Sequence, residues 1–338
     1  MQTFSPTLLK WYHKNKRDLP WRHTKDPYKI WLCEIIMQQT RIAQGLAYYN
    51  RFVKKFPSPL LLARASEDQV LKLWQGLGYY SRARNLHAAA KSMHGKFPTT
   101  YEEVRALKGV GDYTAAAICS IAYDMPYAVV DGNVYRVLAR VFGIDTPIDS
   151  PAGKKQFFTL AQELLDKKRP GDFNQAMMDF GALVCTPQAP QCLTCPLSKY
   201  CKACKARTQE TLPVRAQKTK VSTRYFHYIY VEQGQFTWIH QRGSGDVWQH
   251  LYEPPLIETA NEKLKSPLLK KWFGSANIVP LSKTSLKHVL SHQIIYAYIY
   301  KVKISPTRKV PPGFLKIPTM NLEQYAISRL VQKLLEKI

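Results

Sequence analysis

The chain has 338 residues, of which 45% are hydrophobic and 12% aromatic, a composition typical of a globular protein and not of a disordered one. This length is sufficient for two domains, each with its own core. Lysine and arginine number 49 against 24 aspartates and glutamates, so the net charge of +25 favours a polyanionic partner, nucleic acid before an anionic membrane. No apolar run approaches the roughly 20 residues of a membrane span, so we expect no membrane association.

The N-terminal segment MQTFSPTLLKWYHKNKRDLPW has no apolar core followed by a small-residue cleavage site, so no secretory signal is expected. We therefore expect a protein of the bacterial cytoplasm, associated with the nucleoid.

A short helix, Pro6–Lys16, precedes the basic turn KRDLPWR. Arg17, Trp21 and Arg22 in this turn are candidates for contact with a base or a phosphate. The alternative is an exposed charged turn with Trp21 packed on the core.

The region from residue 28 to residue 180 predicts one helix after another, separated by short Gly, Pro and Ser punctuation. The expected helices are 28–55, 66–76, 81–94, 100–106, 113–123, 133–142, 153–167 and 173–183. Strict two-residue alternation is almost absent here, so the region is expected to be all-α.

The segment Pro27–Thr40 places a single acid, Glu34, among apolar residues at helical spacing. A carboxylate on a largely apolar face loses hydration in its charged form, so its pKa should rise. A carboxylic acid that is still protonated near neutral pH can act as a general acid. The alternative is that Glu34 lies on the solvated edge of the helix.

Two inter-helical turns have compositions suited to nucleic acid. Residues 75–87, QGLGYYSRARNLH, interleave tyrosines with arginines, and such rings can insert or stack between bases while cations meet phosphates. A buried tyrosine pair is the alternative.

The second turn is LKGVGDYT. Its glycines, Gly109 and Gly111, can take φ > 0 and leave backbone N–H groups at the start of the next helix for a DNA phosphate. A short Gly-x-Gly alone is weak support.

Asp131, in AVVDGNVYR, is the natural N-cap of the helix 133–142, and this structural role is one reading of it. Backbone donors at an N-cap favour the carboxylate, so Asp131 is expected to remain ionised. An ionised Asp facing a protonated Glu is a division of labour known in glycosidic-bond cleavage. One acid protonates the leaving group and the other stabilises the oxocarbenium-like transition state.

Five of the seven cysteines lie between residues 185 and 204. Cys185, Cys192, Cys195 and Cys201 have the spacing C-x6-C-x2-C-x5-C, which predicts thiolate ligands of one [4Fe–4S] cluster. Zinc is the competing occupant, although zinc sites usually pair two short C-x(2–4)-C motifs. Disulfides are not expected without an export signal. Cys204 lies three residues after the last of these four cysteines and is not among the predicted ligands.

The expected domain boundaries follow from a change in composition after the cysteines. Residues 1–204 form the helical domain, and the polar, basic segment 205–221 is a linker. Residues 222–338 read as an α+β domain. There, Tyr225–Val231 and Phe236–Gln241 predict a hairpin, Gln293–Ile304 predicts a further strand, and Leu322–Leu335 predicts a helix.

The cysteine spacing, the Gly-Val-Gly turn and an acid 20 residues after Gly111 together resemble the helix-hairpin-helix glycosylase superfamily. Within its iron–sulfur branch, six segments between residues 15 and 204 resemble the adenine DNA glycosylase (MutY) family: RDLPWR, EIIMQQT, GLGYYSRARNLHAAA, GVGDYTAAAI, VDGNVYRVLAR and FNQAMMDFGALVC. VWQHLYEPP and the LSH at 290–292 resemble its Nudix-like domain more loosely. The resemblance implies an all-α glycosylase domain with an iron–sulfur loop, followed by an α+β Nudix-like domain.

The resemblance also implies an activity: removal of adenine mispaired with 8-oxoguanine, or less well with guanine, in double-stranded DNA by a monomeric, monofunctional enzyme. Glu34 would protonate adenine N7, and Asp131 would stabilise the sugar cation. Tyr113 and Asn133 would complete the catalytic pocket. Tyr113 stands where strand-cleaving relatives carry a Schiff-base lysine, so no efficient lyase is expected. The implied substrate and DNA contacts are Arg17, Trp21, Arg22, Gln39, Thr40, Tyr79, Gly109, Gly111 and Gln175, with Ser291 and His292 reading the lesion.

The sequence departs from the family pattern at three positions. Asp112 replaces a common proline and puts an acid near the expected phosphate, and Leu290 replaces a phenylalanine of the lesion-reading loop. Gln175 replaces the glutamate of some relatives. The acidic Nudix hydrolase motif is absent after residue 253, so nucleotide hydrolysis is not expected. An oxidised-pyrimidine glycosylase resembling endonuclease III and a lesion-binding protein without turnover are the rival functions.

Overall fold

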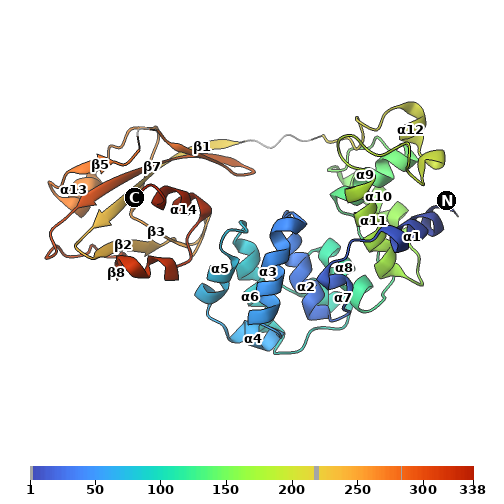
Figure 1. Cartoon of the computed structure of the whole chain (residues 1–338), viewed down its shortest axis with the longest axis horizontal. Helices are drawn as coiled ribbons and strands as arrows, with labels where there is room; N and C mark the ends of the chain where they lie inside the picture. Colours follow the sequence, from blue (N-terminus) through green and yellow to red (C-terminus); the bar gives the residue numbers. More distant parts are fainter. Residues whose placement is uncertain (1–2, 217–220, 283) are drawn as a thin grey trace. The chain divides into compact units, whose positions relative to one another are not determined.

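The computed structural model describes residues 3–216, 221–282 and 284–338, which form two compact units (Figure 1). The first unit contains residues 1–63 and 88–217 and is helical. The second contains residues 64–87 and 218–338 and joins two helical segments to the strands of the C-terminal half. The predicted fold class, a helical domain followed by an α+β domain, is confirmed. In the described residues no helix is both long and apolar enough to cross a membrane.

The helices of the N-terminal half follow the expected order. They are α1 Phe4–Asn15, α2 Pro27–Met37, α3 Ile42–Lys55, α4 Pro59–Arg64, α5 Glu67–Trp74, α6 Ser81–Ser92, α7 Tyr101–Ala106, α8 Asp112–Ala122, α9 Gly132–Phe142, α10 Pro151–Leu164, α11 Pro170–Leu183 and α12 Lys202–Ala206. Short 3₁₀ turns occupy Pro20–Arg22 and Ser198–Tyr200. Helices α1, α9, α10 and α11 contribute to one core, in which Leu8, Val137 and Phe157 are fully buried.

The single helix expected over 28–55 is wrong, because the structure breaks it into α2 and α3. Gln38 leaves the helical region of backbone space, and Gln39 takes a positive φ of 54°. The apolar spacing continues across the break, which is why periodicity alone does not reveal it. The result is a turn directly after the helix that carries Glu34.

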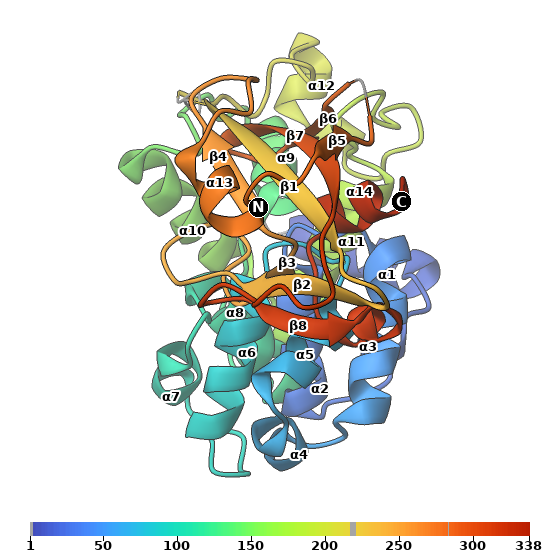
Figure 2. The same cartoon turned by 90° about the vertical axis from the view of Figure 1, so that its left-hand side faces the viewer.

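The strands of the described residues form two sheets. One has the order β4 (Leu256–Thr259), β1 (Ser222–Glu232), β7 (Gln293–Lys303) and β5 (Ile278–Pro280), with β6 (Leu286–Val289) also pairing with β7. The other has the order β3 (Tyr252–Glu253), β2 (Phe236–Gln241) and β8 (Leu315–Pro318). Helices α13 (Pro267–Phe273) and α14 (Arg329–Leu335) complete this half. Figure 2 shows β1 and β7 side by side, and they pair in parallel.

Strand β1 is buried on both faces, because two separate cores pack against it. Phe226 and Tyr228 belong to one core, and Ile229 and Val231 belong to the other. Successive side chains of a strand point to opposite faces, so a strand between two cores lacks polar alternation. This explains the continuous run YFHYIYV.

The predicted hairpin is confirmed at its turn only. Gln233 and Phe236 form an antiparallel bridge, with Gln233 N donating to Phe236 O at 3.0 Å and Phe236 N donating to Gln233 O at 3.2 Å. Beyond the turn, β1 pairs with β4 and β7, whereas β2 pairs with β3 and β8. The local pattern identifies strands but not their partners.

The helix expected over 322–335 is shorter than predicted and covers only Arg329–Leu335. Ser328 caps its start, because the Ser328 hydroxyl accepts a hydrogen bond from Val331 N at 3.2 Å.

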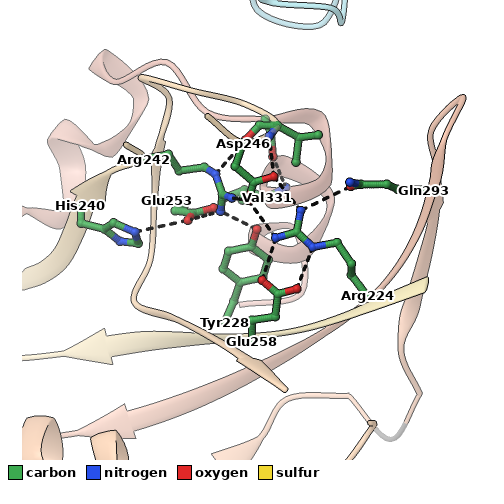
Figure 3. Close-up of polar contacts among 11 residues, drawn as sticks. Arg224, Tyr228, His240, Arg242, Asp246, Glu253, Glu258, Gln293 and Val331 are labelled. Carbon is green, nitrogen blue, oxygen red and sulfur yellow. Dashed lines mark hydrogen bonds and ion pairs between the residues drawn. The ribbon is translucent and has the colours of Figure 1, made fainter. Parts of the chain in front are cut away.

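A network of charged side chains lies in the second unit (Figure 3). Glu253 is buried and accepts from Arg242 at 2.7 Å and from the Tyr228 hydroxyl at 3.0 Å. Asp246 accepts from Arg242 at 2.6 Å and from Arg224 at 2.6 and 2.8 Å. Buried charges require such partners. The network ties the loop after β2 to strand β1.

Candidate active site

Glu34 lines a cavity of about 430 Å³ in the first unit. Asp26 caps the start of α2 by accepting from Tyr28 N at 3.0 Å, and Pro27 occupies the first helical position. The rest of α2 is buried on nearly every side, including Ile30 and Trp31. Glu34 is thus a half-buried carboxyl group on a largely apolar helix, and it lines the cavity.

The surroundings of Glu34 raise its pKa from 4.5 to about 7. Burial is the largest cause, and the nearby Asp131 adds to it, while a hydrogen bond from Tyr113 and the charge of Arg22 oppose it. A carboxyl group with this pKa is about half protonated at neutral pH, as a general acid requires.

Asp131 caps α9 and lines the same cavity. Its carboxylate accepts from Val134 N at 2.8 Å and from the Asn133 amide at 2.9 Å. Burial nevertheless raises the pKa of Asp131, and these two hydrogen bonds only limit the rise. An N-cap alone favours the ionised carboxylate, but at this cap desolvation outweighs the backbone donors.

Tyr113, on α8, lies near both acids and lines the same cavity. Its hydroxyl hydrogen bonds the Glu34 carboxyl and lies 3.4 Å from Met178 Sδ. Burial and the two nearby acids raise the pKa of Tyr113 well above its ordinary value, so the phenol is neutral. The residue can donate a hydrogen bond to Glu34 but has no amine for a Schiff base.

Arg17 and Arg22 enter the cavity wall from the turn after α1, and both bind Asp179 on α11. Arg22 donates to Asp179 Oδ1 at 2.9 Å, and Arg17 Nε donates to the same oxygen at 3.0 Å. Arg22 also donates to the side-chain oxygen of Gln175. Asp179 is fully buried. Sequence reasoning missed it, although it lies in the quoted segment FNQAMMDFGALVC, four residues after Gln175.

The structure brings together most of the residues expected at the pocket. Those that line the cavity with Glu34 are Arg17, Trp21, Arg22, Thr40, Tyr113, Asp131, Asn133 and Gln175. Gln39 borders an adjoining cavity that shares Glu34, Tyr113 and Asp131. Trp21 also packs edge-on against Tyr49, with ring centroids 5.2 Å apart, as the alternative reading of this residue expects.

The turn 107–111 has one glycine with positive φ, not two. Gly109 takes φ 83°, whereas Gly111 is extended at φ −95° and caps α8. Asp112, the acid near the expected phosphate, is paired with Arg105. The extra negative charge is therefore neutralised locally, and the turn retains backbone N–H groups at the start of α8.

Tyr79, Ser291 and His292 belong to the second unit. Tyr79 has φ 46° and is 51% exposed in the turn between α5 and α6. Ser291 and His292 form the exposed turn between β6 and β7, with Ser291 Oγ 3.2 Å from His292 Nδ1. Leu290 is partly buried and packs against a core of this unit.

Five cysteines lie close together near α9 and α12. The thiols of Cys195 and Cys201 have raised pKa values, chiefly through burial, and Cys185 contributes to both increases. The Cys192 thiol hydrogen bonds Cys204. Among the described residues, no three or more His, Cys, Asp or Glu side chains are grouped as a single-ion site. The donor set is all thiol, which suits an iron–sulfur cluster.

Two buried arginines of α9 hold this cysteine loop. Arg140 donates to the carbonyls of Thr186 at 2.6 Å and Pro187 at 3.0 Å, and its NH1 lies 3.5 Å from Cys185 Sγ. Arg136 donates to the Cys185 carbonyl at 2.7 Å and to the Asn133 side chain at 2.8 Å. The Asn133 amide in turn donates a hydrogen bond to the Asp131 carboxylate. A continuous chain of hydrogen bonds therefore joins the cysteine loop to the cavity.

Two family models match the chain. Residues 32–165 match the HhH-GPD superfamily base excision DNA repair protein model, and residues 226–337 match a NUDIX domain model. Among solved structures, a thermostable thymine-DNA glycosylase has a TM-score of 0.57 and 31% identity, covering 61% of this chain and 96% of that chain. An endonuclease III–DNA complex has a TM-score of 0.53 at 22% identity, covering 62% and 96%, which supports the fold alone.

Curated relatives match most or nearly all of the chain. The chain is 34% identical to the adenine DNA glycosylase of Buchnera aphidicola from Acyrthosiphon pisum, covering 98% of this chain and 97% of that protein. The mouse adenine DNA glycosylase is 34% identical over 92% of this chain and 73% of its own length. The human one is 45% identical over 62% of this chain and 41% of its own length. The chain therefore belongs to the adenine DNA glycosylase family, as a DNA N-glycosylase of base excision repair with a C-terminal Nudix-type domain.

Proposed function

We propose that this enzyme removes adenine paired with 8-oxoguanine, and less efficiently adenine paired with guanine, from duplex DNA. The observation that carries the proposal is the shared cavity of Glu34, Tyr113 and Asp131, in which the pKa of Glu34 is about 7. Adenine must leave the base stack to enter such a cavity, at a cost of a few kcal/mol that protein–DNA contacts offset.

Glu34 acts as the general acid in this proposal. Its protonated carboxyl donates to N7 of the extruded adenine, which makes the base a better leaving group. Tyr113 holds the carboxyl group through their hydrogen bond. The excision rate should fall as the pH rises above about 7, because Glu34 then loses the proton that it must donate.

Asp131 stabilises the sugar cation that forms as adenine leaves, and water then completes the hydrolysis. The hydrogen bonds from Val134 and Asn133 favour the charged carboxylate that this role needs. Arg17, Arg22 and Gln175 form a polar edge of the cavity that can bind the adenine ring. Tyr113 supplies no amine, so the strand stays intact.

The remaining contacts read and hold the duplex. Gln39 and Tyr79 insert near the mispair, and Ser291 with His292 reads 8-oxoguanine. Gly109 and Gly111 present backbone N–H groups to a phosphate. The Nudix-like domain serves recognition and does not hydrolyse nucleotides. We propose that the enzyme works as a monomer in the bacterial cytoplasm, and sedimentation velocity of the purified chain tests its oligomeric state.

Cys185, Cys192, Cys195 and Cys201 would hold one [4Fe–4S] cluster, which would stabilise the basic loop containing Lys199 and Lys205 and take no part in bond cleavage. Iron and acid-labile sulfide near four each per chain, with the broad visible absorption of such a cluster, would support this. One zinc per chain and no sulfide would contradict it.

Single-turnover cleavage of a duplex with adenine opposite 8-oxoguanine tests the activity, using wild type and Glu34→Gln. The proposal predicts a break that appears only after alkali and is lost in Glu34→Gln. Breaks without alkali would indicate a lyase resembling endonuclease III. Tight lesion binding with no adenine release would indicate a binding protein.

A further inference from the structure

The turn that carries Tyr79 is bound by two segments from the far end of the chain. It joins α5 to α6, and its backbone takes positive φ at Gly76 (99°), Gly78 (76°) and Tyr79 (46°). A non-glycine residue in this region is unfavourable unless its surroundings hold it there. The neighbouring contacts are therefore relevant to how Tyr79 is presented.

The first segment is residues 325–327, between a 3₁₀ turn and α14. Tyr80 donates its hydroxyl proton to Ile327 O at 3.3 Å and accepts from Gly76 N at 3.2 Å. The Gln75 side chain accepts from Ile327 N at 3.4 Å, and Lys72 donates to Tyr325 O at 3.2 Å. These bonds lie on both sides of Tyr79 in the sequence.

The second segment is residues 249–252, which contacts the two helices beside the turn. Arg84 donates to Gln249 O at 2.8 Å, and His250 pairs with Glu67. Tyr252 donates to Asp68 at 3.4 Å. The segment is itself fixed by the network of Figure 3, because Arg242 accepts at its carbonyl from His250 N at 3.0 Å and binds Asp246 and Glu253.

We propose that segments 249–252 and 325–327 together form a brace that holds the Tyr79 turn in the conformation that inserts at the mispair. This inference rests on the proposed function. Lys72, Gln75, Tyr80 and Arg84 are then positioning residues, which act through Tyr79 and need not touch DNA. A turn ordered in advance loses less conformational entropy when it binds the duplex, so weakening the brace should slow excision.

Tyr80→Phe removes the hydrogen bond from the turn to Ile327 of the brace. Lys72→Met removes the hydrogen bond to Tyr325 with little change in side-chain volume. The matched control is Tyr123→Phe, since the Tyr123 hydroxyl also donates to a backbone carbonyl, Pro98 O at 2.8 Å, but lies in the other unit. We expect the double variant Lys72→Met/Tyr80→Phe to release adenine about three- to tenfold more slowly in single turnover, and the control to match wild type.

A double-mutant cycle separates positioning from general stability. In a Tyr79→Ala background, the same double substitution should change the rate less than about twofold, because the residue through which the brace acts is gone. An equal loss in both backgrounds would overturn the proposal. That result would show that the brace residues affect the rate without acting through Tyr79.

Hydrogen exchange on the full-length chain without DNA gives a readout that is independent of activity. Amides of residues 76–81 should exchange faster in the double variant than in wild type or Tyr123→Phe. Unchanged exchange would refute the brace even if wild type removes adenine. If exchange is faster in the double variant but the wild type releases no adenine, the proposed function is refuted and the brace contacts remain supported.

Discussion

Arg22 donates to Asp179 Oδ1 at 2.9 Å, and this ion pair is almost completely enclosed: the Arg22 side chain is 6% exposed and the Asp179 side chain 0%. Arg17 shares the same carboxylate. One buried acid therefore fixes two cations in the wall of the cavity that contains Glu34. Removing one member of such a group leaves the others buried without a counter-charge.

Asp179→Asn should consequently lower both stability and activity. Breaking a buried ion pair from one side costs about 3–5 kcal/mol, and Arg17 and Arg22 would lose their common anchor. Chemical denaturation measures the free energy of unfolding, and single-turnover adenine release measures the rate. Asp166→Asn is the control, because Asp166 binds a half-exposed arginine, Arg169, three residues away. Equal effects of the two substitutions would contradict this assignment.

Glu34 should make the protein less stable as the pH rises. Its folded-state pKa of about 7 lies above its ordinary value of 4.5, so between these pH values the folded chain binds more protons than the unfolded chain. The free energy of unfolding therefore falls through this window, by about 3 kcal/mol in total. Glu34→Gln cannot ionise and should lose this dependence.

Denaturation at pH 4 and pH 8 tests the linkage. Glu34→Gln should be more stable than wild type at pH 8, and this advantage should disappear at pH 4, where wild-type Glu34 is protonated. Glu210→Gln changes an exposed acid and controls for the loss of one charge. If the difference between Glu34→Gln and wild type were the same at both pH values, the raised pKa of Glu34 would be wrong.

The sequence predicts most of the helices, because apolar residues recur at helical spacing and some helices, such as α2 and α9, begin at a capping aspartate, Asp26 or Asp131. It also predicts the raised pKa of Glu34 and the capping position of Asp131, but not that burial raises the pKa of Asp131. It does not reveal what depends on distant contacts. The break between α2 and α3 interrupts no hydrophobic pattern, and strand β1 finds its partner β7 about 70 residues away.

Asp179 shows the same limit within the site. An aspartate in a largely apolar helix is read locally as a polar exception, and only the fold shows that Arg17 and Arg22, more than 150 residues away, meet it. The role of Arg140 is equally hidden from the sequence, because its carbonyl partners, Thr186, Pro187 and Leu212, lie outside helices and strands and 46 or more residues away. Such roles are set by tertiary contacts, which periodicity does not encode.

Arg140→Lys should release the cysteine loop. A guanidinium group can donate to several carbonyls at once, whereas the lysine ammonium is a compact charge that cannot span Thr186, Pro187 and Leu212 together. We expect a lower melting temperature and a lower iron content per chain than in wild type. Arg169→Lys, at an exposed pair, should keep both at the wild-type level. Full iron content in Arg140→Lys would show that the loop is held by other contacts.

Gly109 and Gly111 should respond differently to the same substitution. Gly109→Ala places a side chain at φ 83°, which is strained and should cost about 1 kcal/mol or more of stability. Gly111→Ala is unstrained at φ −95°, and its new methyl group would meet no protein atom within 4 Å. If this open space is where a DNA phosphate approaches the start of α8, the methyl group obstructs it.

Gly111→Ala should therefore keep the wild-type melting temperature while weakening duplex binding by about tenfold, equivalent to about 1.4 kcal/mol. Gly109→Ala should lower the melting temperature as well. Thermal denaturation and fluorescence anisotropy with a labelled duplex, at one fixed salt concentration, measure the two effects separately. The added methyl group meets no other part of the protein, so it can weaken binding only by contact with the DNA. Wild-type affinity in Gly111→Ala would therefore contradict the approach of a phosphate to this turn.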